Sequence, residues 1–121
     1  MVSRDELNQI EAGTWTERRL QQSFIADALS LRIRLCYHTW DSRHSAAGFP
    51  DLIMLHGGRG LAVELKSERG KIRDEQAEWL HAFALLPGMR SYTFRPHDYL
   101  SGRCLDALLW LVGGGEGEKK K

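Results

Sequence analysis

The sequence predicts a single α/β domain, with a mixed four-stranded sheet flanked by helices. Segments with apolar residues at helical spacing are interspersed with short runs of strand character, in the order helix, three strands, helix, strand, helix. Helices packed on the faces of a mixed sheet are the natural architecture for this order. The chain has 121 residues, 42% of them hydrophobic, which is enough for one core.

Residues 1–13 are polar and predict an N-terminal arm, in which Ser3 and Glu6 have the spacing of a capping box for a short helix. A longer helix is expected to start after Thr14, because Glu17 then occupies its third position as in a second capping box. Apolar residues recur behind it at helical spacing, and the helix is expected to end near Ser30. These residues are Leu20, Phe24, Ala28 and Leu31.

Three strands are predicted next. Residues 31–40 alternate in polarity, which is typical of a strand. Its apolar face would carry Leu31, Ile33, Leu35 and Tyr37. After a polar loop, residues 50–55 and 61–66 predict a hairpin around residues 56–60, whose glycines permit the positive φ that tight turns require.

A second long helix is predicted over residues 73–86, and Pro87 ends it. Its apolar face would carry Ala77, Leu80, Phe83 and Ala84, with Trp79 beside them. Residues 89–95 read as the fourth strand, and Asp98 is expected to cap a last helix. That helix would run through Leu105, Leu108 and Val112. Residues 113–121 have no apolar group to bury and predict a flexible tail.

The bulk composition narrows the class of protein. The net charge of +1 excludes a large overall basic excess but allows a local basic patch for nucleic acid. The longest apolar run, residues 107–112, is too short to span a membrane, and the N-terminus lacks the pattern of a signal peptide. Two cysteines fit neither a disulfide scaffold nor a zinc site. We therefore expect a cytoplasmic protein with reduced thiols and no membrane association.

The predicted hairpin carries an unusual set of charges. Glu64 and Lys66 point to the same face of the second strand, and Asp51 can reach that face from the first. Converging carboxylates can hold Mg²⁺ when phosphate and water complete its coordination shell, and an ammonium can orient water beside it. This set of side chains suits phosphodiester cleavage. The alternative is an exposed edge hairpin in which Glu64 and Lys66 form an ordinary ion pair.

The surrounding sequence resembles the virus-type replication-repair nuclease (VRR-NUC) domain, a branch of the PD-(D/E)XK nuclease superfamily. The resemblance rests on the run Gly48-Phe49-Pro50-Asp51-Leu52, then Glu64-Leu65-Lys66, Gln76 and Trp79. Glu17 with Gln21, and His38 followed by Ser42, Arg43 and Ser45, are similar to the rest of the family's pattern. It covers roughly residues 14–100 and implies a restriction-endonuclease-like core. We expect a nuclease domain over residues 14–112, between the arm and the tail.

The resemblance also implies roles for single residues. Asp51 and Glu64 would bind the metal, with the Leu65 carbonyl as a backbone ligand and Glu17 completing the shell directly or through water. Lys66 would be the catalytic lysine, and Gln76 would lie against the active site. A second interpretation of Glu17 stays open: it could be a helix-capping residue with a structural role and no role in catalysis.

Four residues are expected to contact nucleic acid. Arg43, Arg69 and Lys71 lie in loops beside the predicted site, where they would bind phosphates. The alternative for them is an ordinary solvated surface. His38 ends the first strand, where it would touch DNA or the outer shell of the metal, or else be a partly buried histidine with satisfied hydrogen bonds.

We therefore predict a Mg²⁺- or Mn²⁺-dependent DNA endonuclease in a bacterium or a phage-infected host. The resemblance implies a preference for branched DNA, as in Holliday-junction resolvases. Paired cuts at a four-way junction need two sites and hence a homodimer, for which the apolar last helix is the candidate interface. The alternatives are a catalytically inactive DNA-binding or assembly module, and a nuclease for flaps, restriction or RNA.

Overall fold

The computed structural model describes residues 1–39 and 45–113. The elements in chain order are α1 (Arg4–Ala12), α2 (Glu17–Ser30), β1 (Leu35–His38), β2 (Leu52–His56), β3 (Arg59–Leu65), α3 (Asp74–Ala84), β4 (Met89–Phe94), α4 (Pro96–Leu100) and α5 (Arg103–Leu111). Within these residues, no helix has the length and apolar character needed to cross a lipid bilayer.

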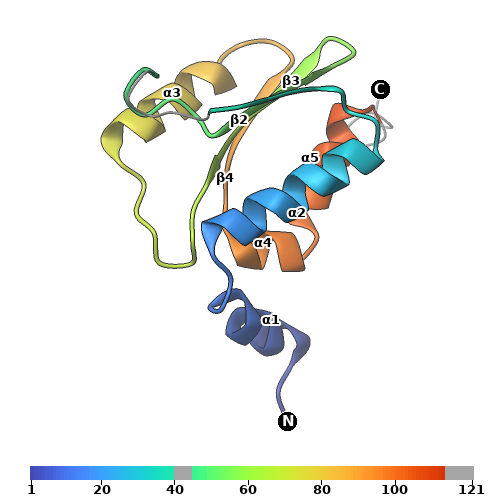
Figure 1. The fold of residues 1–121 in the computed structure, drawn as a ribbon, viewed down its shortest axis with the longest axis vertical. Helices are drawn as coiled ribbons and strands as arrows, with labels where there is room; N and C mark the ends of the chain where they lie inside the picture. Colours follow the sequence, from blue (N-terminus) through green and yellow to red (C-terminus); the bar gives the residue numbers. More distant parts are fainter. Residues whose placement is uncertain (40–44, 114–121) are drawn as a thin grey trace.

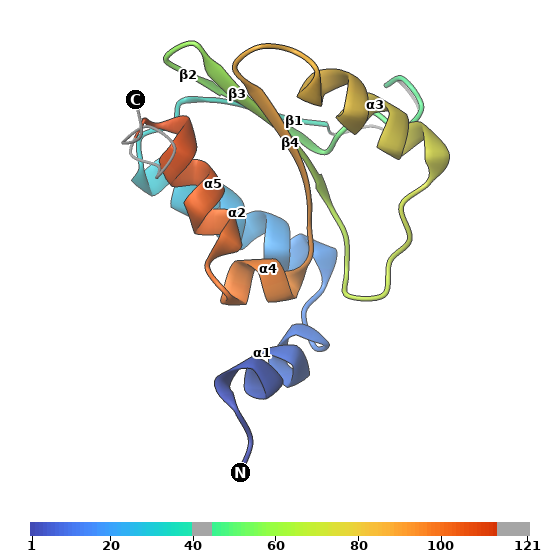
Figure 2. The same cartoon turned by 180° about the vertical axis from the view of Figure 1, so that it is seen from behind.

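The strands form one sheet in the order β1-β2-β3-β4. β1 and β2 pair antiparallel, as do β2 and β3, whereas β4 runs parallel to β3. Helices α2, α4 and α5 lie on one face of the sheet and α3 lies on the other (Figures 1 and 2). The predicted α/β class with a mixed four-stranded sheet and flanking helices is confirmed.

The core lies between the sheet and the layer of α2, α4 and α5. The sheet contributes alternate residues to it because side chains alternate along a strand. Phe24 of α2 meets Phe94 of β4 edge-on, with ring centroids 5.7 Å apart. The other large buried side chains of this cluster include Leu20, Leu52, Met54, Leu61, Val63, Leu65 and Leu108.

The last predicted helix is two helices in the structure. Gly102 separates α4 from α5 with a φ of +93°, which a residue with a side chain rarely adopts. Asp98 is therefore not the cap of a long helix. It is buried inside α4, where its Oδ2 accepts a hydrogen bond from the Arg95 N–H at 2.8 Å.

The apolar breadth of α5 is also explained without a partner. Most of its apolar residues are buried: Cys104, Ala107, Leu108, Trp110 and Leu111. Only Leu105, 43% exposed, presents a large apolar surface to solvent. Burial in the core therefore accounts for the apolar residues that suggested α5 as a dimer interface.

The start of α2 differs from the prediction by two residues. Thr16 is the N-cap, and its hydroxyl accepts a hydrogen bond from the Arg19 N–H at 3.1 Å. The Thr14 hydroxyl instead donates to the Glu11 carbonyl at the end of α1. Glu17 is thus the first helical residue, and the predicted capping box at Thr14 is wrong. The capping box of α1, between Ser3 and Glu6, is confirmed.

The first strand is shorter than predicted, and its outward face is apolar. Arg32 has a φ of +64°, which turns the chain after α2, so that pairing begins only at Leu35. Leu35 and Tyr37 are 60% and 56% exposed, because they lie on the face that α3 covers only over β3 and β4. Ile33, which lies before the strand, is buried as predicted.

Helix α3 also packs differently from the prediction. Ala77 and Ala84 are exposed, and Gln76 is its only buried residue. The helix is fixed instead by aromatic contacts with the loop before β2. The ring of Phe49 packs edge-on against Trp79 at 5.0 Å, and the Trp79 indole N–H donates to the Ala47 carbonyl at 3.0 Å.

Candidate active site

Asp51 and Glu64 meet because of the hairpin register. Leu52 pairs with Val63 in the antiparallel ladder, so Asp51 and Glu64 follow as the next opposed positions at the same end of the strands. Asp51 Oδ2 accepts a hydrogen bond from the Leu65 N–H at 2.7 Å. This bond fixes one carboxylate oxygen against the backbone of β3. The predicted convergence of the two carboxylates is what the structure has.

The loop that carries Asp51 is held on both sides. The Thr39 hydroxyl donates to the Pro50 carbonyl at 2.9 Å, and the Thr39 N–H donates to the Asp51 carbonyl at 2.9 Å. Gly48 has a φ of +79°, and a Cβ on it would lie 2.5 Å from the backbone of Glu75 at the start of α3. Only glycine allows the loop to approach α3 this closely.

Glu64 is the most constrained group of the site. The residue is 3% exposed, and its Oε2 accepts a hydrogen bond from Gln76 Nε2 at 2.7 Å. Its Oε1 is buried with no hydrogen-bond partner among the described residues. Burial first, and then the negative charge of Asp51, raise the pKa of Glu64 to about 7. Because an unpaired buried oxygen is costly, this arrangement needs a functional explanation.

Lys66 lies one residue beyond β3. Its N–H donates to the Phe94 carbonyl at 3.0 Å, which continues the pairing with β4 past the strand end. Its Nζ is 3.7 Å from Glu64 Oε2, and the side chain is 13% exposed. The ammonium therefore stands beside Glu64 with access to solvent, and its charge opposes the rise in the pKa of that carboxyl.

Gln76 enters the site from the first turn of α3. Its Oε1 accepts a hydrogen bond from the Arg73 N–H at 2.9 Å, so its Nε2 is directed at Glu64. The amide thus joins the start of the helix to the carboxylate. A cavity of about 350 Å³ opens on this side, and its lining includes Thr39, Asp51, Arg73 and Gln76.

Glu17 is placed at the edge of the site and not within it. It is the exposed first residue of α2, and its charge is the smallest of the influences that raise the pKa of Glu64. Within the described part of the chain, no three Asp, Glu, His or Cys residues are close enough to hold a metal ion. Asp51 and Glu64 are the two carboxylates that the hairpin register brings together. Leu65, the predicted backbone ligand, is the last residue of β3, and its side chain is buried in the core.

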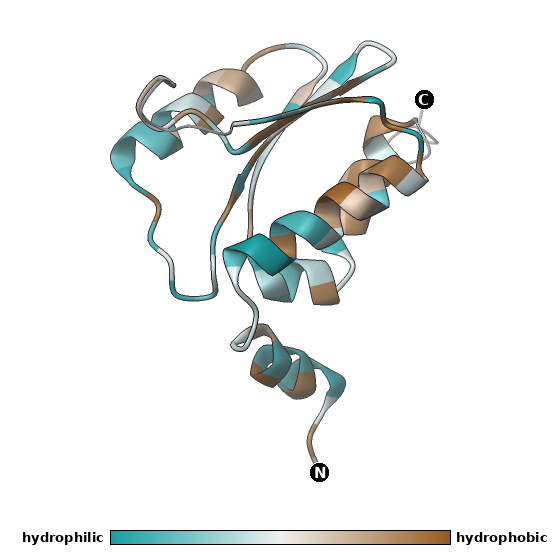
Figure 3. Cartoon of the chain, viewed as in Figure 1, coloured by the Kyte–Doolittle hydropathy of each residue, from teal (hydrophilic) through white to brown (hydrophobic). Residues whose placement is uncertain are grey.

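The described residues that were expected to contact nucleic acid lie on two segments, the loop after β3 and the end of β1. Arg69 and Lys71 are exposed in the loop between β3 and α3, and His38 is half-buried at the end of β1. Arg43 lies outside the described residues. Hydrophilic residues gather on this loop and on the first turn of α2 (Figure 3).

The loop after Lys66 is held by Arg95, a residue that the sequence did not single out. Arg95 Nη1 donates to the carbonyls of Ser67 at 2.7 Å, Glu68 at 3.2 Å and Gly70 at 2.7 Å. The Glu68 carboxylate in turn accepts from the His97 N–H at 2.8 Å and lies 2.9 Å from its Nδ1. The only signal in the sequence was the position of Arg95 between a strand and a proline.

Comparison with known proteins agrees with this geometry. Residues 5–95 match the family model of the VRR-NUC domain. No curated protein and no solved structure gives a significant match to the chain.

Proposed function

Because the chain belongs to the VRR-NUC family of PD-(D/E)XK nucleases, we propose that it is a divalent-metal-dependent endonuclease that hydrolyses DNA phosphodiester bonds. The observation that carries the proposal is the buried Glu64 Oε1, which has no protein partner among the described residues although Asp51 and Lys66 are close by. A carboxylate oxygen in this state is a ready ligand for a cation.

The residues fit Mg²⁺ or Mn²⁺. Asp51 and Glu64 would bind it with oxygen ligands, the Leu65 carbonyl would add a backbone ligand, and Glu17 would act directly or through water. When bound, the ion polarises the scissile phosphate and lowers the pKa of a coordinated water.

The protein groups around the carboxylates have separate tasks. Gln76 keeps Glu64 oriented through the hydrogen bond to Oε2, which leaves Oε1 free for the ion. The Lys66 ammonium would donate a hydrogen bond to the attacking water or to the phosphate, where it offsets the developing negative charge. Arg43, Arg69, Lys71 and His38 would contact the DNA strand on either side of the cleaved bond.

We further propose that the substrate is branched DNA, four-way junctions above all. The active form would be a homodimer, in the cytoplasm of a bacterium or of a phage-infected host. A groove of about 320 Å³ between α3 and the edge strand β4 supports a dimer surface there in place of α5. It is lined by Ile72, Ala77, Leu80, His81, Ala84, Ser91, Tyr92 and Thr93. Edge strands and apolar grooves of this kind are commonly covered by a second chain.

The testing experiment is cleavage of labelled four-way junction, flap, linear duplex and RNA substrates with Mg²⁺, Mn²⁺ or EDTA. We expect metal-dependent cuts at the branch point, and we expect Asp51→Asn to abolish them while binding and fold persist. Cleavage by Asp51→Asn at the wild-type rate would show that the site is wrongly assigned. Binding without cleavage by the wild-type chain would instead favour an inactive DNA-binding module.

A further inference from the structure

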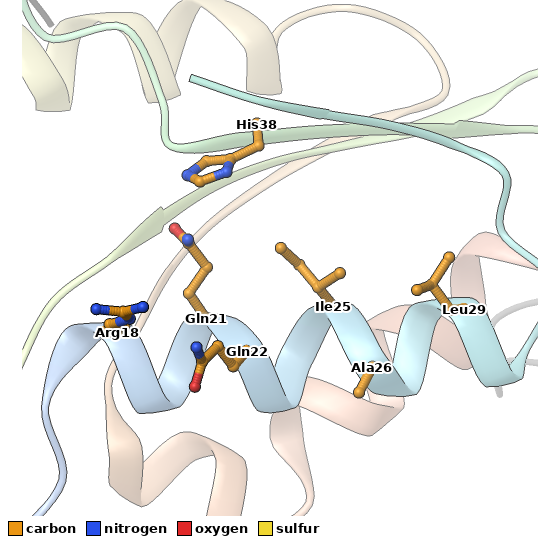
Figure 4. Close-up of a pocket in the computed structure, with 7 residues that line it drawn as sticks. All are labelled: Arg18, Gln21, Gln22, Ile25, Ala26, Leu29 and His38. Carbon is orange, nitrogen blue, oxygen red and sulfur yellow. The ribbon is translucent and has the colours of Figure 1, made fainter. Parts of the chain in front are cut away.

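A second recess lies on the other side of the active site, between α2 and β1. It measures about 560 Å³ and is lined by Arg18, Gln21, Gln22, Ile25, Ala26, Leu29 and His38. Gln21, Ile25 and Leu29 point from α2 toward β1, and His38 points from β1 toward Gln21 (Figure 4). We call this recess the α2–β1 groove.

Two lining residues of the groove lie next to proposed site residues, one in the sequence and one across the sheet. On α2, Arg18 directly follows Glu17. On the sheet, His38 pairs with Leu52, the residue after Asp51. Leu52 in turn pairs with Val63, the residue before Glu64, so the groove mouth lies at the same end of the sheet as Asp51 and Glu64. The groove then leads away from the site along α2 as far as Leu29.

The floor of the groove is apolar and adjoins the core, against which Ile25 packs. The core face of α2 consists of Leu20, Phe24 and Ala28, which are all fully buried. Ile25 is half-buried and Leu29 is 62% exposed on the side facing β1. An apolar strip that leads into a polar catalytic site is a feature of binding surfaces.

The mouth of the groove is polar and cationic. The amides of Gln21 and Gln22 each supply donors and an acceptor, and Arg18 supplies a positive charge. His38 adds a planar imidazole, and none of the described lining residues is acidic. Amides pair with base edges, and imidazole rings stack on base faces. Arginine beside them suits the adjoining phosphate.

We propose that the α2–β1 groove receives the base of one unpaired nucleotide next to the scissile phosphate. This inference rests on the proposed nuclease function and refines its substrate. A base inside an intact duplex is stacked and paired and cannot enter the groove, whereas a base at a branch point is already partly freed, so extruding it costs less. The groove would thereby select branched over linear DNA.

An apolar peptide or a second copy of the chain fits the groove less well. Either would bury the Arg18 guanidinium and the two glutamine amides at the mouth, which is costly without matched partners. A nucleotide offers a phosphate that can pair with the Arg18 guanidinium and polar base edges that can hydrogen-bond to the glutamine amides.

The test uses 2-aminopurine, a fluorescent base that brightens when it leaves the stack. It is placed in turn at each nucleotide around the branch point of a junction, and fluorescence is followed as the non-cleaving Asp51→Asn protein binds. We expect one position to brighten on binding. We also expect the wild-type enzyme with Mg²⁺ to prefer branched over linear DNA by roughly tenfold through this contact.

Two groove variants, each combined with Asp51→Asn for the fluorescence measurement, test the location. Gln21→Leu keeps the side-chain size but removes the amide, and Ile25→Gln places an amide on the apolar floor. Gln9→Leu, at an exposed position of α1, is the matched control. The groove variants should lose the brightening, and without Asp51→Asn they should lose the branched-DNA preference. Gln9→Leu should keep both. Because Ile25 packs against the core, Ile25→Gln is expected to lower the melting temperature, whereas Gln21→Leu should melt close to the parent and therefore decides the test.

The outcomes separate this inference from the nuclease proposal. If the wild-type chain cuts junctions while no position brightens, or if the brightening survives both groove variants, the nuclease proposal stands and the groove holds no base. If the variants change the molecular mass in light scattering and leave the brightening intact, the groove is a protein interface and the inference is wrong. Absence of any metal-dependent cleavage would overturn the nuclease proposal itself.

Discussion

Gln76 Nε2 donates to one oxygen of Glu64 at 2.7 Å, while the other oxygen of the same carboxyl group is buried without a partner among the described residues. Helix α3 thus provides a hydrogen bond to one carboxylate oxygen of Glu64 and none to the other oxygen. A group arranged this way destabilises the metal-free fold, because burying an incompletely paired charge is costly. Function and stability therefore conflict at a single side chain.

Replacing Glu64 by glutamine should raise the melting temperature of the metal-free protein while abolishing cleavage. The amide oxygen can still accept from Gln76, and no charge is buried. We expect a gain of about 1–3 kcal/mol in the free energy of unfolding at pH 8. Thermal melts in EDTA measure it, with the exposed Glu78→Gln as the control that should change little.

The gain should depend on pH in a defined direction. The pKa of Glu64 is raised from 4.5 to about 7 by burial and by Asp51, so between these values the unfolded chain holds fewer protons than the folded one. Stability of the wild type should therefore fall as the pH rises through this window. The advantage of Glu64→Gln should be present at pH 8 and vanish near pH 4.5. An equal advantage at both pH values would contradict this explanation.

Arg95 should be a positioning residue for the loop that follows the catalytic lysine. Its Nη1 binds three carbonyls of residues 67–70, so Arg95→Met leaves those carbonyls without this donor. We expect a cost of roughly 1–3 kcal/mol in stability and weaker DNA binding, because Arg69 and Lys71 lose their fixed placement. KM and kcat on a junction substrate, with a thermal melt, provide the measurement.

A conservative variant distinguishes positioning from charge alone. The lysine ammonium carries three N–H donors on one nitrogen, so Arg95→Lys should recover part of the binding. The exposed Arg4→Met on α1 removes the same charge without touching the loop and should behave as wild type. If Arg4→Met weakens DNA binding as much as Arg95→Met does, net charge is responsible and the positioning role is wrong.

The sequence predicts the fold where local patterns and global packing agree. The alternation along β2 and β3 placed Asp51 and Glu64 together, because strand period and hairpin register depend on neighbouring residues. The same alternation predicted the wrong buried face for β1, where Leu35 and Tyr37 have strand character but face outward. Which face of an edge strand is covered depends on where α3 docks, and period alone cannot show this.

The active-site environment was less predictable than its residues. Arg95 lies 25 to 28 positions from the carbonyls that it binds, and no local pattern encodes such a pair. Gln76 was expected against the site by resemblance, but its hydrogen bond to Glu64 requires the docked helix. The predicted position of Glu17 within its helix was wrong. Threonine is an equally good N-cap at residue 14 and at residue 16, so residue type could not distinguish the two.

The proposed dimer surface predicts the molecular mass of the protein in solution. It also predicts that a substitution in this surface halves that mass. Light scattering should give about twice the 13.8 kDa of one chain. Ala84 is exposed and lines the groove between α3 and β4, so Ala84→Glu would place a charge in the interface and should yield monomers. Ala82→Glu, on the same helix but outside that groove, is the matched control. A wild-type monomer that still makes paired cuts in junctions would rule out the dimer.

Glu17 is the residue at which a structural role and a catalytic role can be distinguished most clearly. As the first residue of α2, with Thr16 as the cap, it forms no capping box, so its remaining structural role is a favourable charge at a helix N-terminus. Losing that charge costs only about 0.3–1 kcal/mol. As an outer ligand of the metal, it would instead contribute negative charge to the ion, and glutamine is a neutral, poorer ligand.

We therefore expect Glu17→Gln to melt within a few degrees of wild type and to lose most of its cleavage rate with Mg²⁺. Part of the rate should return at high Mn²⁺, because this ion tolerates a weaker oxygen ligand set. The exposed Glu11→Gln at the end of α1 serves as the control and should retain full activity. If Glu17→Gln cleaves as fast as wild type at low Mg²⁺, then Asp51 and Glu64 suffice to hold the ion, and the role of Glu17 is confined to the helix terminus.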